Sequence, residues 1–320
     1  MDDVAKFGEF PFDRYTIVRS VSYCPLRFPL VTDSSFKAKW DPASPLSKEK
    51  QKRALFEQWL ALGDWGRRVG FLLGSFHTPT INSLKAESIQ ELQEYMIDPA
   101  NPVEIPAYVP RDLQPPEERK HSEPMQSLVW IRTWFGDSGN KASEQAADAN
   151  YNRLVLHALQ GGSRSGENDV VRPQFMFTGR DEFGTNCYDG NGDIENGVAT
   201  AKAGSRPWYV VSSLMHCPRQ LYGTPRGILD EAEWEKEQSV LFLVADRKAC
   251  EEGFVLFLAI NHRACVLPFR MRVRAYDVDI ISSNWTGNGE PIQDNWNNPD
   301  EDIEIHLDEE EGWAQCEELD

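Results

Sequence analysis

The residues from Ser239 to Ser282 hold the densest apolar stretch of the chain and set most of the limits on its fold. Residues 240–244 and 254–260 are unbroken apolar runs of five and seven residues, rich in Val and Phe. Such runs, bounded by charged or glycine-containing turns, are typical of strands buried on both faces of a sheet. We therefore expect the centre of the sheet here.

The next segment, residues 264–281, alternates between apolar and charged positions. Side chains that alternate along a strand point to opposite faces, so three arginines share one face: Arg270, Arg272 and Arg274. Beyond Ala275 the apolar positions change parity. A one-residue slip reverses every side chain of a strand, so this change predicts a bulge or a strand break at 274–276.

The remaining periodicities indicate helices early in the chain and strands late. They predict helices over 48–62, 64–73, 82–96, 143–160 and 230–238, and strands over 15–21, 128–135, 174–178 and 208–215, with a long loop over 179–206. We therefore expect an α+β fold: a mixed, largely antiparallel sheet from the second half of the chain, with an N-terminal helical layer.

Seven prolines between Pro99 and Pro124 indicate an extended connector. The chain then divides into four regions. These are a mainly helical region over 1–98, a connector over 99–125, a mixed α/β core over 126–283 and an acidic tail over 284–320.

The charge of the chain is unevenly distributed. Residues 275–320 contain 15 acidic residues and no Lys or Arg, which is −15 of a total of −18, so the preceding 274 residues carry −3. An acidic tail repels nucleic acid and anionic membranes and attracts basic surfaces. The body offers no compensating basic patch, so neither a nucleic-acid nor a membrane partner is expected.

Three features bear on the compartment. No basic segment followed by an apolar one opens the sequence, and no apolar run reaches the roughly 18 residues of a membrane span. Six cysteines are scattered singly along the chain, which is typical of reduced thiols rather than a disulfide framework. We expect a soluble protein of the cytoplasm or nucleus.

The arginine row of Arg270, Arg272 and Arg274 is the clearest basic feature. Guanidinium groups two residues apart can bind a phosphate or a carboxylate with paired hydrogen bonds. Since the acidic tail begins directly after this strand, the tail itself is the simplest anionic partner, and an external anion is the alternative.

The tail segment 302–311 alternates apolar and polar residues before a run of acids, with apolar positions at Ile303, Ile305 and Leu307. An extended segment of this kind can add a strand to the edge of a partner's sheet while its acids meet a basic rim. The pattern resembles a SUMO-interacting motif, which implies that these three residues dock on a partner. An edge strand of the protein's own sheet, or disorder, would produce the same pattern.

The loop 189–197 carries alternating oxygen-bearing side chains, Asp189, Asn191, Asp193 and Glu195. Hard cations such as Ca²⁺ prefer such ligands. The loop departs from an EF-hand because Ile194 stands at the glycine position and Thr200 at the bidentate glutamate position. The alternative is a solvated turn. No other cofactor is expected.

One possible catalytic set combines His262, Asp277 and Cys316, since a thiol nucleophile needs an imidazole base and an orienting carboxylate. This order after a buried strand pair resembles the SUMO-deconjugating, Ulp-type cysteine proteases, over at most the last 70 residues. The chain lacks the His-Trp pair of that family, and Glu317 stands where a glycine is expected. The acidic surroundings of Cys316 also disfavour a thiolate.

No phosphate-binding, dinucleotide-binding or zinc-protease motif is present. The leading hypothesis is a non-catalytic intracellular interaction protein whose acidic C-terminus engages a basic partner or the Arg270–Arg274 strand. The alternatives are a thiol-dependent hydrolase and a coat-like assembly subunit. The sequence leaves open both the oligomeric state and whether the chain is an enzyme.

Overall fold

The computed structural model describes residues 41, 43–61, 63, 128–160, 173, 175–179, 194–217, 221, 235–295, 305–306 and 313. The chain divides into two compact units. The first comprises Met1–Glu123, Leu214–Glu235 and His262–Ala264, and the second comprises Pro124–Ser213, Lys236–Asn261 and Cys265–Asp320. The predicted region boundaries at 98, 125 and 283 stay predictions.

Helix α4 (Lys48–Ala61) is the helix that the structure describes in the first unit. Ser47 caps it, because its Oγ accepts a hydrogen bond of 3.3 Å from the Lys50 amide. Four apolar side chains of this helix are buried: Leu55, Phe56, Trp59 and Leu60. The predicted helices over 64–73 and 82–96 and the strand over 15–21 lie outside the described residues.

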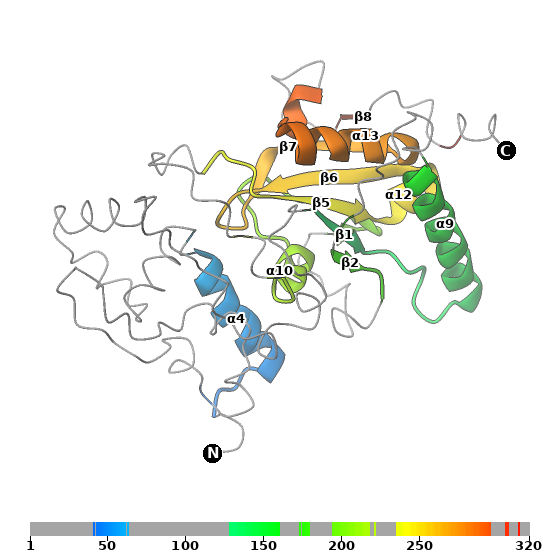
Figure 1. Ribbon diagram of the computed structural model, residues 1–320. Coiled ribbons are helices and arrows are strands. Elements are labelled where there is room, and N and C mark those ends of the chain that lie inside the picture. Colours follow the sequence, from blue (N-terminus) through cyan, green and yellow to red (C-terminus); the bar gives the residue numbers. More distant parts are fainter. Residues whose placement is uncertain are drawn as a thin grey trace, which may run out of the picture. The chain divides into compact units, whose positions relative to one another are not determined.

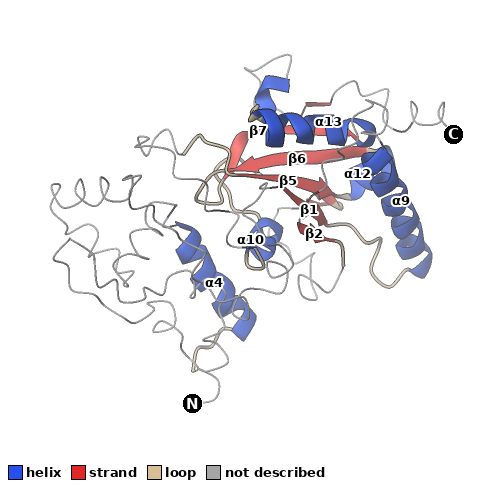
Figure 2. Ribbon diagram, in the orientation of Figure 1, coloured by secondary structure: helices blue, strands red, loops and turns tan. Residues whose placement is uncertain are grey.

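A six-stranded sheet in the order β2-β1-β5-β6-β7-β8 forms the core of the second unit (Figures 1 and 2). Its strands are β1 (Leu128–Arg132), β2 (Phe175–Phe177), β5 (Val240–Ala245), β6 (Phe254–Ile260), β7 (Val266–Arg274) and β8 (Ile305–His306). The three longest strands, β5, β6 and β7, pair antiparallel, whereas β1 pairs parallel with β2 and β5, and β8 pairs parallel with β7.

These strands confirm the predicted α+β class and its mixed sheet. Every residue of β5 and β6 is buried, as the two unbroken apolar runs indicated. The alternation in β7 is also present, with Met271 and Val273 in the hydrophobic core and the arginines at the intervening positions. The neighbouring strands β5 and β6 therefore bury both of their faces. Strand β7 is buried at some positions and partly exposed at others.

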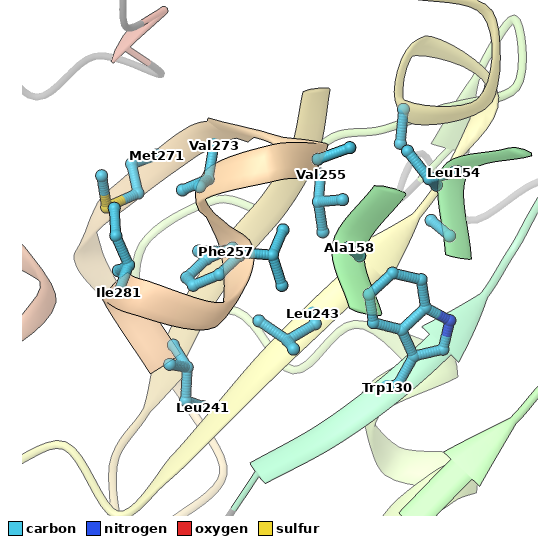
Figure 3. Close-up of a cluster of buried hydrophobic side chains, with 14 of the residues drawn as sticks. Trp130, Leu154, Ala158, Leu241, Leu243, Val255, Phe257, Met271, Val273 and Ile281 are labelled. Atoms are coloured by element: carbon cyan, nitrogen blue, oxygen red, sulfur yellow. The ribbon is translucent and has the colours of Figure 1, made fainter. Parts of the chain in front are cut away.

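Helices α9 (Lys141–Gln160), α12 (Arg247–Glu252) and α13 (Val278–Ser283) contribute to the hydrophobic core. Figure 3 shows side chains of the strands meeting those of α9 and α13 in this core. Asn140 caps α9 by accepting hydrogen bonds from the Ala142 and Ser143 amides. The apolar side chains Ala147, Tyr151, Leu154 and Ala158 of α9 are buried, and Val155 is partly buried against the same core.

The predicted break at 274–276 is confirmed, but its cause is a change of secondary structure. Strand β7 ends at Arg274, a 3-10 turn spans Ala275–Asp277, and α13 follows. The apolar residues Val278 and Ile281 are three positions apart and face the core, while Ile280 is exposed. The parity change thus marks the start of a helical period.

The prediction of a strand over 208–215 is wrong, because this segment forms the helix α10 (Trp208–Leu214). Its β-branched and aromatic residues are buried almost all round, and an apolar run of that kind has no periodicity that separates a strand from a buried helix. Pro207 precedes it, and the Pro207 carbonyl accepts a hydrogen bond from the Val211 amide.

Three smaller corrections follow. The segment predicted as the long loop 179–206 contains a hairpin, β3 (Ile194–Glu195) and β4 (Val198–Ala199), which turns through Asn196 and Gly197 at positive φ. The connection between the two buried runs is the helix α12 rather than a turn. The predicted helix over 230–238 is described at its end, where residues 235–237 form turns and a bend.

After α13 the chain continues through a π-helical turn, Asn284–Asn288, and a 3-10 turn, Ile292–Asn295. None of the helices in the described parts of the chain is long and apolar enough to cross a lipid bilayer.

Candidate functional site

The C-terminal segment returns to the sheet of the second unit. Strand β8 pairs parallel with the outer edge of β7, with Ile305 opposite Met271 and His306 opposite Arg272. Backbone pairing of this kind satisfies edge N–H and C=O groups that would otherwise face water. Ile305, one of the three residues predicted to dock on a partner's sheet, thus pairs with the protein's own sheet, whereas Ile303 and Leu307 lie outside the described residues.

A second contact of the C-terminal segment lies at Trp313, which packs against the hydrophobic core. We call the three residues around its ring the Trp313 seat: Arg153, His157 and Gly253. The Arg153 guanidinium carbon lies 4.2 Å from the centroid of the Trp313 ring, and the His157 ring lies 5.4 Å away, edge-on at 61°. Arg153 and His157 are four positions apart on α9, so they lie on the same face of that helix.

Gly253 supplies the flat third side of the seat. It ends α12 in the left-handed conformation at φ 86°, and its amide donates a hydrogen bond of 3.0 Å to the Ala249 carbonyl. A Cβ built at this position would lie 3.0 Å from Cδ2 of Trp313. Glycine is therefore required twice, once for the backbone angle and once for the close approach of the indole.

Each arginine of the row has a hydrogen-bond partner within the second unit. Arg272 is fully buried and binds Asp246 with two hydrogen bonds, of 2.7 Å to Oδ1 and 2.6 Å to Oδ2. Arg274 donates to Asp277 over 2.6 Å, and Arg270 donates to the Ala201 carbonyl. The hypothesis that residues of the acidic tail beyond the described ones also engage this row stays a prediction.

Asp246 accepts hydrogen bonds from several elements of the second unit. Besides Arg272, it accepts hydrogen bonds from the Ala249 amide, which makes it the N-cap of α12, and from the Ala199 amide of β4. It follows β5 in the same parity as Phe242 and Val244, and its pairing with Arg272 places both side chains on one face of the sheet. One buried carboxylate thus ties together β4, β5, α12 and β7.

The predicted metal loop is described in part. Glu195 is exposed in β3, and Asp189, Asn191 and Asp193 lie outside the described residues. Among the residues that the structure describes, no three His, Cys, Asp or Glu side chains gather as a metal site.

The structure describes two of the three residues of the predicted catalytic set, His262 and Asp277. His262 belongs to the first unit, where its Nε2 lies 3.6 Å from Glu235. Asp277 belongs to the second unit and accepts the hydrogen bond from Arg274. Cys316 lies outside the described residues, so the catalytic set stays a prediction.

The buried thiol of Cys250 is not suited to act as a nucleophile. Desolvation by burial raises the pKa of Cys250 to about 12. A thiol with such a pKa is protonated at neutral pH, and the thiolate is the reactive form. Cys250 therefore serves as a small apolar core residue on α12.

Sequence reasoning missed the residues of the Trp313 seat and Asp246. A signal existed for Asp246, because an aspartate between a strand and a short helical segment is a common N-cap. An isolated tryptophan in an acidic segment was a second signal, since tryptophan commonly anchors contacts.

Comparisons of the chain with protein-family models, with curated proteins and with solved structures found no match.

Proposed function

We propose that this chain is a non-catalytic protein-interaction module whose acidic C-terminal segment is the binding element. Its partner is a basic protein surface with an accessible sheet edge. The segment would add a strand to that edge, and the acids that follow would meet basic side chains around it.

The pairing of β8 with β7 is the observation that carries this proposal. Ile305 and His306 pair in parallel register with a sheet edge to which they are joined by a long stretch of chain. Residues 296–304 separate them from the last described turn, Ile292–Asn295, so the pairing depends on the main chain rather than on a tight turn. The same backbone chemistry is available to any other sheet edge.

The sequence around β8 supports a basic partner. Asp308 begins a run of four acidic residues that ends at Glu311, and residues 275–320 contain no Lys or Arg to neutralise them. Exposed charges are screened over about 8 Å at physiological ionic strength, so the attraction acts at close range and weakens with salt. Within the described second unit, the arginines of β7 already have partners of their own.

We further infer that the protein works inside the cell. Six cysteines scattered singly along the chain are typical of a reducing compartment, cytoplasmic or nuclear. The thiol-hydrolase and assembly-subunit alternatives gain no specific support from the described residues.

Charge neutralisation in the full-length chain tests the proposal. The tail variant carries Glu309→Gln, Glu310→Gln and Glu311→Gln. The control variant makes the same change of charge in the body, at Glu57, Glu144 and Glu195. Affinity capture from a cell lysate at about 0.15 M salt is followed by quantitative mass spectrometry of wild type and both variants.

The wild type and the control are expected to capture the same set of proteins with basic surfaces, and the tail variant to lose them. The set should also shrink as salt is raised, because screening weakens exposed charge pairs. An identical set captured by the wild type and the tail variant would contradict the proposal.

A further inference from the structure

The two contacts of the C-terminal segment define a surface with two parts. The first part is the outer edge of β7 at Met271 and Arg272, where β8 pairs. The second is the Trp313 seat. We propose that this surface is a docking site for a segment consisting of a short strand, an acidic spacer and a tryptophan, and that Ile305, His306 and Trp313 of the chain's own C-terminal segment fill it as a reversible latch.

This inference rests on the proposed function, because it identifies where the binding segment is held when no partner is present. Each contact is small. The backbone pairing in the register of β8 covers two residues, and Trp313 is half-buried. Among the residues that the structure describes, the contact consists of a two-residue strand and one aromatic ring. A contact of this size lies at the low end of local stability, so it can open while the sheet stays folded.

The seat fits tryptophan better than a smaller apolar side chain. A guanidinium stacked over an aromatic ring is attracted by the ring's negative face, and the attraction is largest for tryptophan. Arg153 occupies that position, His157 meets the ring at its edge, and the Cβ-free surface of Gly253 lets the indole approach the backbone. Three sides of the ring are thus matched by three different chemical groups.

A second copy of this chain carries the same segment, and it is the occupant to which we assign the site in trans. The segment would leave its own body and pair with β7 of a second molecule, or compete with that molecule's own segment. Exchange of an identical element between copies costs little, because each contact broken in cis is remade in trans.

Peptide binding to the full-length chain tests the docking site. The probe is a fluorescein-labelled peptide of residues 301–320 with Cys316→Ser, and the matched peptide also carries Trp313→Ala. Binding of both peptides is followed by fluorescence anisotropy on the wild-type chain and on the full-length Trp313→Ala chain, whose seat is vacated. We expect the tryptophan-containing peptide to bind the Trp313→Ala chain at least fivefold more tightly than the wild type, and the matched peptide to show no such difference.

Equal binding of the tryptophan-containing peptide to both chains would overturn the inference, as would binding that is indifferent to the peptide's own tryptophan. When Arg153→Ala is added to the Trp313→Ala chain, the affinity for the tryptophan-containing peptide should fall by a similar factor. The charge-matched control on the same background is Arg247→Ala, a cation of α12 with its own partner, Glu251. An equal loss of peptide affinity in the Arg153→Ala and Arg247→Ala variants would show that the peptide is attracted to positive charge in general. That result would also overturn the inference.

Hydrogen exchange keeps the inference testable if the Trp313→Ala chain fails to fold. In the otherwise wild-type chain, Arg153→Ala should speed exchange of the Ile305 and His306 amides at least fivefold, and Arg247→Ala should leave it unchanged. Unchanged exchange in Arg153→Ala would refute the latch. These outcomes are independent of capture of basic proteins, so the docking site and the proposed function can fail separately.

Discussion

Two arginine contacts of the second unit, Arg272 with Asp246 and Arg153 with Trp313, differ in how deeply they are buried. The comparison separates a contact that stabilises the fold from one that belongs to the candidate site. At Arg272, a guanidinium with no exposure binds a carboxylate that also has none, and three further backbone groups join them. At Arg153, a guanidinium stacks on a half-buried ring from the C-terminal segment. Opening the first contact would leave charges buried inside the sheet, whereas we propose that the second opens while the sheet stays folded.

The difference follows from what each contact leaves behind when it breaks. Removing one partner of a buried pair leaves an uncompensated charge in an apolar interior. Withdrawing Trp313 leaves a cation and an imidazole that water can reach and solvate. A buried ion pair therefore belongs to folding, and an aromatic seat at the edge of the core is suited to binding.

The largest effect is expected from Asp246→Ala, which strands the buried Arg272 and removes the cap of α12. Such a loss costs about 3–5 kcal/mol of unfolding free energy. Urea denaturation of the full-length protein measures it. The control is Asp277→Ala, which removes the half-buried partner of Arg274 and should cost about 1 kcal/mol or less. Comparable losses in the two variants would remove the distinction between the interior pair and the surface one.

A smaller effect is expected from Gly253→Ala. Both Gly253 and Gly204 have positive φ, but a Cβ at Gly204 would meet no atom within 4 Å, whereas at Gly253 it would crowd Trp313. Gly204→Ala therefore reports backbone strain alone, about 1–2 kcal/mol. Gly253→Ala should cost more, and the excess should vanish in the Trp313→Ala background. An excess that persists there would mean that the crowding comes from elsewhere.

Cys250 should make the folded state sensitive to alkali. Its folded pKa of about 12 lies above the ordinary value of 9.0, so the folded state keeps a proton that the unfolded chain releases. Below about pH 9 the thiol is protonated in both states, so the free energy of unfolding is at its full value. It falls as the pH rises from 9 to 12. At pH 10 the loss is on the order of 1 kcal/mol relative to pH 7. Denaturation at both pH values should show this loss in the wild type and lack it in Cys250→Ala; a persisting loss would assign it to other groups.

The smallest effect on global stability is expected from Trp313→Ala, about 1 kcal/mol, because the latch opens without the core. Trp130→Ala is the matched control. Trp130 is 2% exposed and donates a hydrogen bond of 2.9 Å to the Tyr151 hydroxyl, so its loss should cost about 3–5 kcal/mol. If Trp313→Ala cost as much as Trp130→Ala, the C-terminal segment would be part of the core, and the latch would be refuted.

Much of the sheet could be predicted because its strands obey local rules. The runs over 240–244 and 254–260 are apolar on both faces, and β7 alternates with period two, so burial alone identifies them. The segment over 208–215 was wrongly predicted as a strand, since a run that is buried almost all round lacks a period that separates a strand from a helix. Helix α12 is six residues long, and its cap is fixed by Asp246 through contacts that are distant in sequence.

The candidate site was predictable in one part only. The alternation at Ile303, Ile305 and Leu307 indicated a strand that adds to a sheet edge, and Ile305 lies in such a strand. The identity of the edge, β7, depends on which strand the sheet leaves unpaired. Trp313 meets Arg153 and Gly253, which are 160 and 60 residues away along the chain, so no spacing in the sequence reports the contact.

By itself, the sequence determined the apolar centre of the sheet, the position at which β7 ends and the concentration of acid in the last residues, because each depends on neighbours along the chain. The tertiary structure alone decided that Arg272 pairs with Asp246 and that Trp313 lies on α9 and Gly253. The physical reason is that the charge and shape of a side chain follow from the residue type, whereas its partner depends on how distant segments pack together in the folded protein.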